Sequence, residues 1–167
     1  MPNPSVIAGV QALSEPETAF GGYTHKAIIT AADLQALATA VVTSQVFNIA
    51  TIPVGMVLSN PAAYVYVPFT FSDGTILVGT ISVGDTGSGT AYLAASNVQG
   101  TGATSPVALG ASYADTGSRV IKAYSATNTL QLTFTVTATK VLNTATAGEV
   151  HIFWEQRQLA ELVYPQQ

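Results

Sequence analysis

The chain contains no cysteine among its 167 residues. Disulfide bonds and thiolate metal sites are therefore excluded, and the redox compartment stays undetermined. Charge is also scarce, since Asp, Glu, Lys and Arg make up 8% of the chain against about 25% in an average soluble domain. An uncharged polar surface costs less to desolvate than a charged one, so the shortage favours packing on other copies or on a lattice. A monomer with a neutral surface is the alternative.

Basic residues and long apolar runs are missing as well. The five Lys and Arg are scattered and the net charge is -4, so no basic stripe is available to neutralise phosphates. Mean hydropathy is +0.38, yet no run approaches the roughly 18 apolar residues of a membrane-spanning helix. Prolines interrupt the apolar segments and disfavour a transmembrane barrel. We therefore expect neither nucleic acid nor membrane among the partners.

The clearest pattern that is present is a strict alternation over residues 130–138, which read LQLTFTVTA. Leu130, Leu132, Phe134 and Val136 share one face, and Thr and Gln residues cover the other. Successive side chains of a strand lie on opposite faces, so this segment is predicted to be a strand with one buried and one hydroxyl-covered face.

Similar short patterns recur along the chain and predict an all-β fold, a jelly-roll-like antiparallel β-sandwich. The expected strands span residues 23–29, 45–52, 64–71, 76–83, 119–124, 130–138 and 149–155. We expect strands 64–71 and 76–83 to form a hairpin, residues 84–90 a glycine-rich loop, and 92–98 a helical turn or irregular segment. Asp33 lies three residues after Thr30, as in a capping box, and predicts one short helix over about 31–41. A second short helix is expected near residues 155–162.

Two positions in these strands carry specific expectations. Pro68 has no N–H to donate, so its strand should lie at a sheet edge or contain a bulge there. Trp154 is the only tryptophan and shares a predicted face with Val150 and Ile152. We expect its indole to lie in the core.

Three regions are predicted: an N-terminal arm (1–22), a β-sandwich domain (23–155) and a C-terminal tail (156–167). The arm is rich in proline yet contains several large apolar residues. It is expected to pack on a neighbouring subunit or along the domain's own edge, and a disordered terminus is the alternative. The predicted interface residues of the arm and tail are Val6, Ile7, Val10, Leu13, Phe20, Leu159, Leu162, Val163 and Tyr164.

No catalytic constellation is recognisable. His25 and His151 read as ordinary strand residues, because a metal site needs three or four convergent ligands. Asp85 in the glycine-rich loop could contribute to a calcium site, but a tight turn is the favoured interpretation. Glu149 and Glu155 would lie about 20 Å apart on one strand, too far for glycoside hydrolysis. We therefore expect a protein that is not an enzyme, with no catalytic residues, cofactor or metal.

Four segments carry a resemblance to a known group. They read IITAADL at 28–34, FNIATIPVG at 47–55, ISVGDTGSGTAYLAASNV at 81–98 and TAGEVHIFWE at 146–155. In their order the chain resembles the structural, decoration or cement proteins of tailed-bacteriophage virions. The resemblance spans most of residues 23–155 and leaves the arm and the tail outside.

The resemblance implies a jelly-roll-like sandwich that self-associates, commonly as a trimer, and binds the major capsid protein at the capsid surface of a virion. The arm is longer than in the group and suggests an additional attachment device. Related proteins occur in tails, so a tail or head–tail connecting protein is one alternative. A carbohydrate- or receptor-binding module is another, with Tyr64, Tyr66 and Tyr92 as an aromatic platform.

Overall fold

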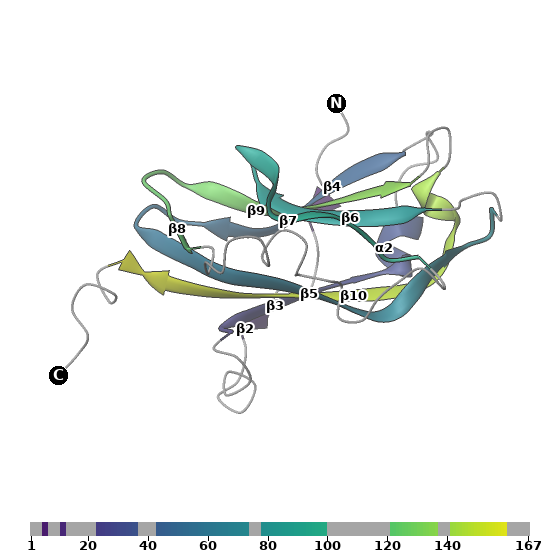
Figure 1. The fold of residues 1–167 in the computed structure, drawn as a ribbon, viewed down its shortest axis with the longest axis horizontal. Helices are drawn as coiled ribbons and strands as arrows, with labels where there is room; N and C mark the ends of the chain where they lie inside the picture. The colour runs from purple at the N-terminus through teal and green to yellow at the C-terminus, as the bar shows by residue number, and fades with distance from the viewer. Residues whose placement is uncertain are drawn as a thin grey trace.

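The computed structural model describes residues 5–6, 11–12, 23–36, 43–73, 78–99, 121–136 and 141–159. These residues form two stacked sheets of five strands each, which are the two layers in Figure 1. Sheet A has the order β1-β4-β9-β6-β7, and sheet B has the order β2-β3-β10-β5-β8. The strands are β1 (Ser5–Val6), β2 (Gln11–Ala12), β3 (His25–Thr30), β4 (Ser44–Ile52), β5 (Met56–Phe71), β6 (Gly79–Asp85), β7 (Ser88–Asn97), β8 (Ile121–Ala123), β9 (Asn128–Val136) and β10 (Ala145–Gln158).

The eight strands from β3 to β10 have jelly-roll topology. The first of them pairs with the last, β3 with β10, and the series continues inward with β4 and β9, β5 and β8, and β6 and β7, all antiparallel. This is one long hairpin that folds over on itself and distributes its strands between two sheets. The predicted all-β, jelly-roll-like sandwich is thereby confirmed.

The core lies between the sheets and follows the predicted alternation. On β9, the side chains of Leu130, Leu132, Phe134 and Val136 are buried. The predicted inner face of β10 is also confirmed, because Val150, Ile152 and Trp154 are fully buried. β9 and β10 therefore each contribute one apolar face to the core between the sheets.

The α-helix α2 (Ala31–Gln35) follows β3 at one end of the sandwich (Figure 1). The predicted capping box is confirmed: the backbone N–H and the hydroxyl of Thr30 both donate to Asp33 Oδ2, at 2.7 and 2.9 Å. The helix ends at Gln35, with Ala36 as its C-cap, and residues 37–41 of the prediction lie outside the described part. Leu34 is buried. The side-chain amide of Gln35 donates to the carbonyl of Ala145, which directly follows the 3-10 helix η2 (Leu142–Thr144).

A bulge interrupts the pairing of β5 with β10 around Pro68, as predicted. Thr70 pairs with Ala147 and Val67 with Glu149, so β5 has one more residue in this interval than β10. The extra residue changes the alternation on β5. Val67 is consequently 42% exposed, whereas Val65 and Phe69 are buried.

The predicted hairpin between strands 64–71 and 76–83 is also wrong. β5 lies in sheet B between β10 and β8, whereas β6 lies in sheet A between β9 and β7. The connection after Phe71 therefore leads from one sheet to the other. Alternation reveals which face of a strand is buried, but it does not reveal the neighbouring strand.

Three further predictions of local structure are wrong. Residues 84–90 do not form a loop. β6 ends at Asp85 and β7 begins at Ser88, so only a two-residue turn, Thr86 and Gly87, separates the two strands. Residues 92–97 belong to strand β7, and residues 155–158 to strand β10 instead of a helix. In both segments, hydrogen bonding to a neighbouring strand outweighs the local propensity.

The arm contributes two short strands to opposite sheets. Ser5 and Val6 pair in parallel with Phe47 and Asn48 of β4, and Gln11–Ala12 pairs with β3. For these four residues the structure agrees with an arm that lies along the domain's own edge. The pairing supplies hydrogen bonds to the outer edges of β4 and β3, which would otherwise be open for another strand.

Candidate functional site

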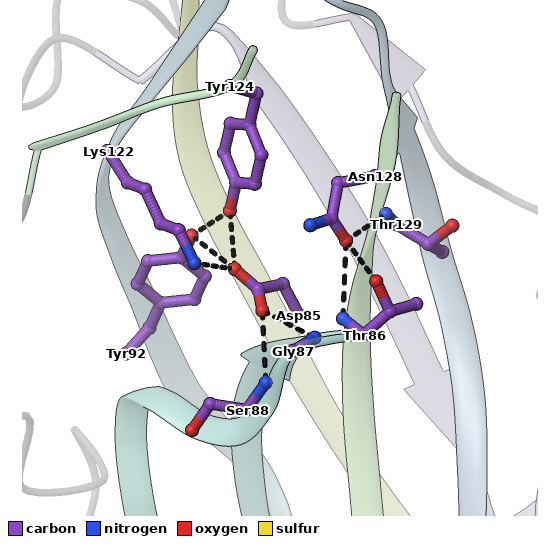
Figure 2. Close-up of polar contacts among 9 residues, drawn as sticks. All are labelled: Asp85, Thr86, Gly87, Ser88, Tyr92, Lys122, Tyr124, Asn128 and Thr129. Carbon is purple, nitrogen blue, oxygen red and sulfur yellow. Dashed lines mark hydrogen bonds and ion pairs between the residues drawn. The ribbon is translucent and has the colours of Figure 1, made fainter. Parts of the chain in front are cut away.

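A buried polar cluster joins the two sheets at the β6–β7 turn. The carboxylate of Asp85 in sheet A is completely buried and forms an ion pair with Lys122 of β8 in sheet B. Tyr124 donates a hydrogen bond to Asp85 Oδ2 at 2.9 Å, and the Tyr92 hydroxyl lies 3.4 Å from the same oxygen. Figure 2 shows Lys122, Tyr124 and Tyr92 converging on this one oxygen.

The second carboxylate oxygen holds the turn itself. The backbone N–H groups of Gly87 and Ser88 donate to Asp85 Oδ1 at 2.9 and 3.1 Å. Asn128 at the start of β9 accepts a further hydrogen bond from the Thr86 N–H at 3.2 Å (Figure 2). The carboxylate therefore accepts from donors of β7, β8 and the turn, and from Tyr124 directly after β8.

The electrostatics keep this cluster in one protonation state near neutral pH. Burial acts to raise the pKa of Asp85, but hydrogen bonds from Lys122, Tyr124 and Gly87, with the charge of Lys122, lower the pKa below its usual value. Burial and the negative charge of Asp85 raise the pKa of Tyr92 to about 12. Burial and hydrogen bonds to Tyr92 and Asp85 also raise the pKa of Tyr124. Both phenols thus remain donors.

This arrangement fits a structural role better than a calcium site. Lys122, Tyr124 and the N–H groups of Gly87 and Ser88 already occupy the two oxygens of Asp85, and a calcium ion would have to displace them. Within the described ranges, no three His, Asp or Glu residues are grouped closely enough to hold a metal ion. The tight-turn interpretation of this segment is confirmed by the Asp85–Ser88 pair.

We predict that Asp85→Asn lowers the free energy of unfolding by about 2–3 kcal/mol, because it leaves Lys122 without its counter-ion and removes an acceptor from buried donors. Urea denaturation at pH 7, followed by far-UV circular dichroism, measures the loss. An Asp85 variant as stable as the wild type would contradict the structural role.

The same carboxylate predicts a dependence on pH. The folded-state pKa of Asp85 is lower than its unfolded value of about 3.9, so its stabilisation is present above pH 4 and is lost as the pH falls through the folded-state pKa. Denaturation midpoints measured between pH 7 and pH 2.5 should therefore fall more steeply for the wild type than for Asp85→Asn. Parallel curves for the two proteins would contradict this expectation.

The outer face of sheet B carries a continuous row of aromatic rings. The ring of Tyr66 stacks on His151 at 4.1 Å between centroids, and the His151 ring lies 6.1 Å from Phe153. Phe153 also contacts Tyr64 at 5.7 Å and Tyr23 at 5.6 Å. Tyr66 is 67% exposed and is adjacent to the exposed Val67. We name these six residues the aromatic face: Tyr23, Tyr64, Tyr66, Val67, His151 and Phe153.

Charged residues lie on β10 on both sides of the aromatic face. Glu149 forms an ion pair with His151 at 2.5 Å if the imidazole is protonated. Arg157, toward the other end of the strand, forms an ion pair with Glu155. These charged residues flank the aromatic face, and Lys26 of β3, which pairs with Phe153, also lies on this outer face.

The outer face of sheet A is different, and it is the hydroxyl face predicted from residues 130–138. Its side chains bond to each other across strands: Ser44 with Thr135 at 2.9 Å, and Gln131 to Asn48 at 3.0 Å. Such pairs stabilise the sheet.

The predicted interface residues are only partly described. Val6 lies in β1 beside Asn48, and Leu159 follows β10, 44% exposed, with its N–H donating to the carbonyl of Gly55. Outside the described residues lie Ile7, Val10, Leu13, Phe20, Leu162, Val163 and Tyr164.

The predicted platform of three tyrosines is wrong at Tyr92, which is buried in the cluster with Asp85. Tyr64 and Tyr66 do share the outer face of sheet B. Sequence reasoning missed Tyr23, His151 and Phe153 as their neighbours, because these residues come from other strands. The only available signal was the alternation on β10, which places residues 151 and 153 opposite the buried Ile152.

The two histidines have different surroundings. His25 stacks on Trp154 at 5.4 Å between centroids and bonds to the Thr24 hydroxyl, and burial lowers its pKa. His151 belongs to the aromatic face.

No helix among the described residues is long and apolar enough to cross a membrane.

Comparison with known protein families, with curated proteins and with solved structures finds no match to this chain.

Proposed function

We propose that this chain is a structural virion protein that decorates and stabilises a bacteriophage capsid by binding its lattice as an oligomer, with a trimer expected. The observation that carries the proposal is the jelly-roll sandwich whose sheet A has an outer face of hydrogen-bonded, uncharged side chains. Only 8% of the residues in the chain are charged. The resemblance of four segments to tailed-phage decoration proteins supplies the identity of the lattice. No enzymatic activity is part of the proposal.

Mass action explains how such a protein would act. A protein that binds the assembled shell but not its separated subunits stabilises the shell by its free energy of binding. Many copies that each contribute a few kcal/mol would together resist the pressure of packaged DNA. A surface with few charges is suited to this task because little hydration is lost when it is covered.

The roles of individual surfaces are assigned as follows. The arm and the tail are the proposed lattice contacts, and the hydroxyl face of sheet A is the proposed site of trimer packing. The described strands β1 and β2 support an arm that pairs with strand edges, the geometry by which extended segments join other sheets.

The test is the mass of the purified chain at micromolar concentration, measured by light scattering after size exclusion. A mass near three times 17.2 kDa is expected. Thr133→Arg on the hydroxyl face should then yield monomers, whereas the exposed turn variant Val54→Arg should not. A monomeric wild type would overturn the proposal, and a ring of six or more copies would favour a tail or head–tail connecting protein.

The aromatic face supports a second candidate function, a carbohydrate- or receptor-binding module. Tyr66 is the observation that favours it, because its ring is 67% exposed and bears a hydroxyl beside His151. Binding of the wild type to a glycan array, lost in Tyr66→Ala, would support this candidate. No binding across diverse glycans would exclude it.

A further inference from the structure

The ring of His25, at the start of β3, covers the indole of Trp154. The two rings stack at 5.4 Å between centroids, with 14° between their planes. Trp154 is fully buried and is the only tryptophan of the chain, whereas His25 is half-buried. The imidazole therefore separates a core residue from the solvent at this point of sheet B.

The hydrogen bonds at this position favour the neutral imidazole. The backbone N–H of Gln156 donates to Thr24 Oγ1 at 2.9 Å, and the Thr24 hydroxyl lies 2.7 Å from Nδ1 of His25. Because Thr24 Oγ1 already accepts from Gln156, its own hydrogen is free to point to Nδ1, which is an acceptor only in the neutral ring. Protonation places a hydrogen on Nδ1 and removes this acceptor.

No carboxylate faces His25 in the described part of the chain. The residues that contact its ring, Thr24 and Trp154, are uncharged, as is strand β2 beside it. The charged or titratable residues of the adjoining segments are Tyr23, Lys26, Glu155 and Arg157. The charged ones alternate with His25 or Trp154 along β3 and β10 and therefore lie on the outer face, where Tyr23 contacts Phe153. Burial without a counter-charge lowers the pKa of His25.

The arm strand β2 is attached to this same end of β3, and Figure 1 shows the two strands side by side. β2 has two register pairs, one with Lys26 and one between Ala12 and His25. The N–H of Thr24 donates to the carbonyl of Trp154 at 3.0 Å and holds this end of β3 against β10. A ladder of two pairs is marginal by itself. The attachment of β2 therefore depends on the position of His25.

We infer that His25 is a pH-sensitive switch for the arm: when its imidazole is protonated in mild acid, the ring leaves Trp154 and β2 separates from β3. The direction follows from linkage. The pKa of His25 in the folded chain lies below its usual value of about 6.5, so the stabilisation is complete above pH 6.5 and is lost as the pH falls through the folded-state pKa. Asp85 loses its own contribution only below pH 4, which separates the two effects.

The first experiment is a titration of tryptophan fluorescence between pH 7.5 and pH 4.5, in which all emission comes from Trp154. We expect the emission maximum to move to longer wavelength as the pH falls, because water reaches the indole once the imidazole has left. His25→Phe retains a ring that cannot be protonated and should abolish the shift. His25→Asn, which is not titratable either, should give an emission maximum that does not depend on pH. The control His151→Phe removes the other histidine of the chain and should retain the shift.

Hydrogen exchange detected by mass spectrometry follows the arm itself. After correction for the effect of pH on intrinsic exchange, the amides of residues 5–12 in the wild type should exchange about tenfold faster at pH 5 than at pH 7.5. In His25→Phe the corrected rates should be equal at the two pH values. Far-UV circular dichroism at pH 5 verifies that the sandwich is still folded.

The outcomes separate this inference from the proposed function. The switch deepens that function, which makes the arm a lattice contact, and rests on it only for the consequence that acid alters the attachment of the chain. Fluorescence that is quenched without a change of wavelength would show that the protonated ring stays on the indole, and would overturn the inference. A shift that persists in His25→Phe, or exchange in the arm that does not respond to pH, would also overturn it. Because neither measurement depends on the mass of the oligomer, a monomeric chain with a pH-dependent arm would overturn the trimer and support the switch.

Discussion

Replacement of Trp154 by alanine is expected to lower the free energy of unfolding by about 3–5 kcal/mol, the range for loss of a large buried aromatic side chain. The indole is fully buried and stacks on His25 of β3 at 5.4 Å. The indole therefore anchors both β10, to which it belongs, and β3, on which it stacks, in the core. Because stabilities of 5–15 kcal/mol are usual for a domain, this one substitution removes a large share of the total.

Urea denaturation followed by far-UV circular dichroism is the appropriate measurement, because the variant lacks the only tryptophan. Trp154→Phe is the matched control and should lose less than half as much, since its ring fills part of the cavity. An alanine variant within 1 kcal/mol of the wild type would show that the indole is not a core residue.

Substitution of Gly148 by alanine is expected to lower the free energy of unfolding by about 2–5 kcal/mol, from backbone strain and overpacking together. Gly148 has a φ of +145°, and a Cβ there would lie 2.1 Å from Cδ1 of Phe69. The Phe69 ring cannot move aside easily, because it is fully buried and packs edge-on against Phe134 at 4.8 Å.

Gly55 provides a control that separates the two causes. It also has a positive φ, of +80°, but a Cβ there meets no atom within 4 Å. Gly55→Ala should therefore cost only the strain, about 1 kcal/mol, in the same denaturation experiment. In the background Phe69→Leu, Gly148→Ala should cost less than in the wild type, because the two residues are in contact. Equal costs for the two alanine variants would contradict the clash.

The sequence was informative wherever a local pattern decided the outcome. The capping box at Thr30 and Asp33 was predictable, because all of its atoms belong to one turn. The irregularity at Pro68 followed from the missing N–H of proline. The surroundings of Asp85 were not predictable, because Lys122 and Tyr124 reach it from the opposite sheet across the sandwich.

The predictions that failed share a cause. Three predictions depended on short-range propensity: a helical turn or irregular segment over 92–98, a helix near 155–162, and a hairpin between 64–71 and 76–83. In the folded chain residues 92–97 pair with β6, and residues 64–71 and 155–158 belong to β5 and β10, which pair with each other in sheet B. One added residue at the β5 bulge was enough to expose Val67.

For the functional surfaces the division is similar. The sequence by itself determined the low charge and the hydroxyl face, because composition and period-two alternation depend only on the order of residues. The tertiary structure alone decided which rings meet on the aromatic face, since Tyr23, Tyr66 and Phe153 come from three different segments. It also decided that Tyr92 is a buried donor and not a surface ring. Alternation determines which side of a strand a residue occupies, whereas strand order and bulges determine its neighbours.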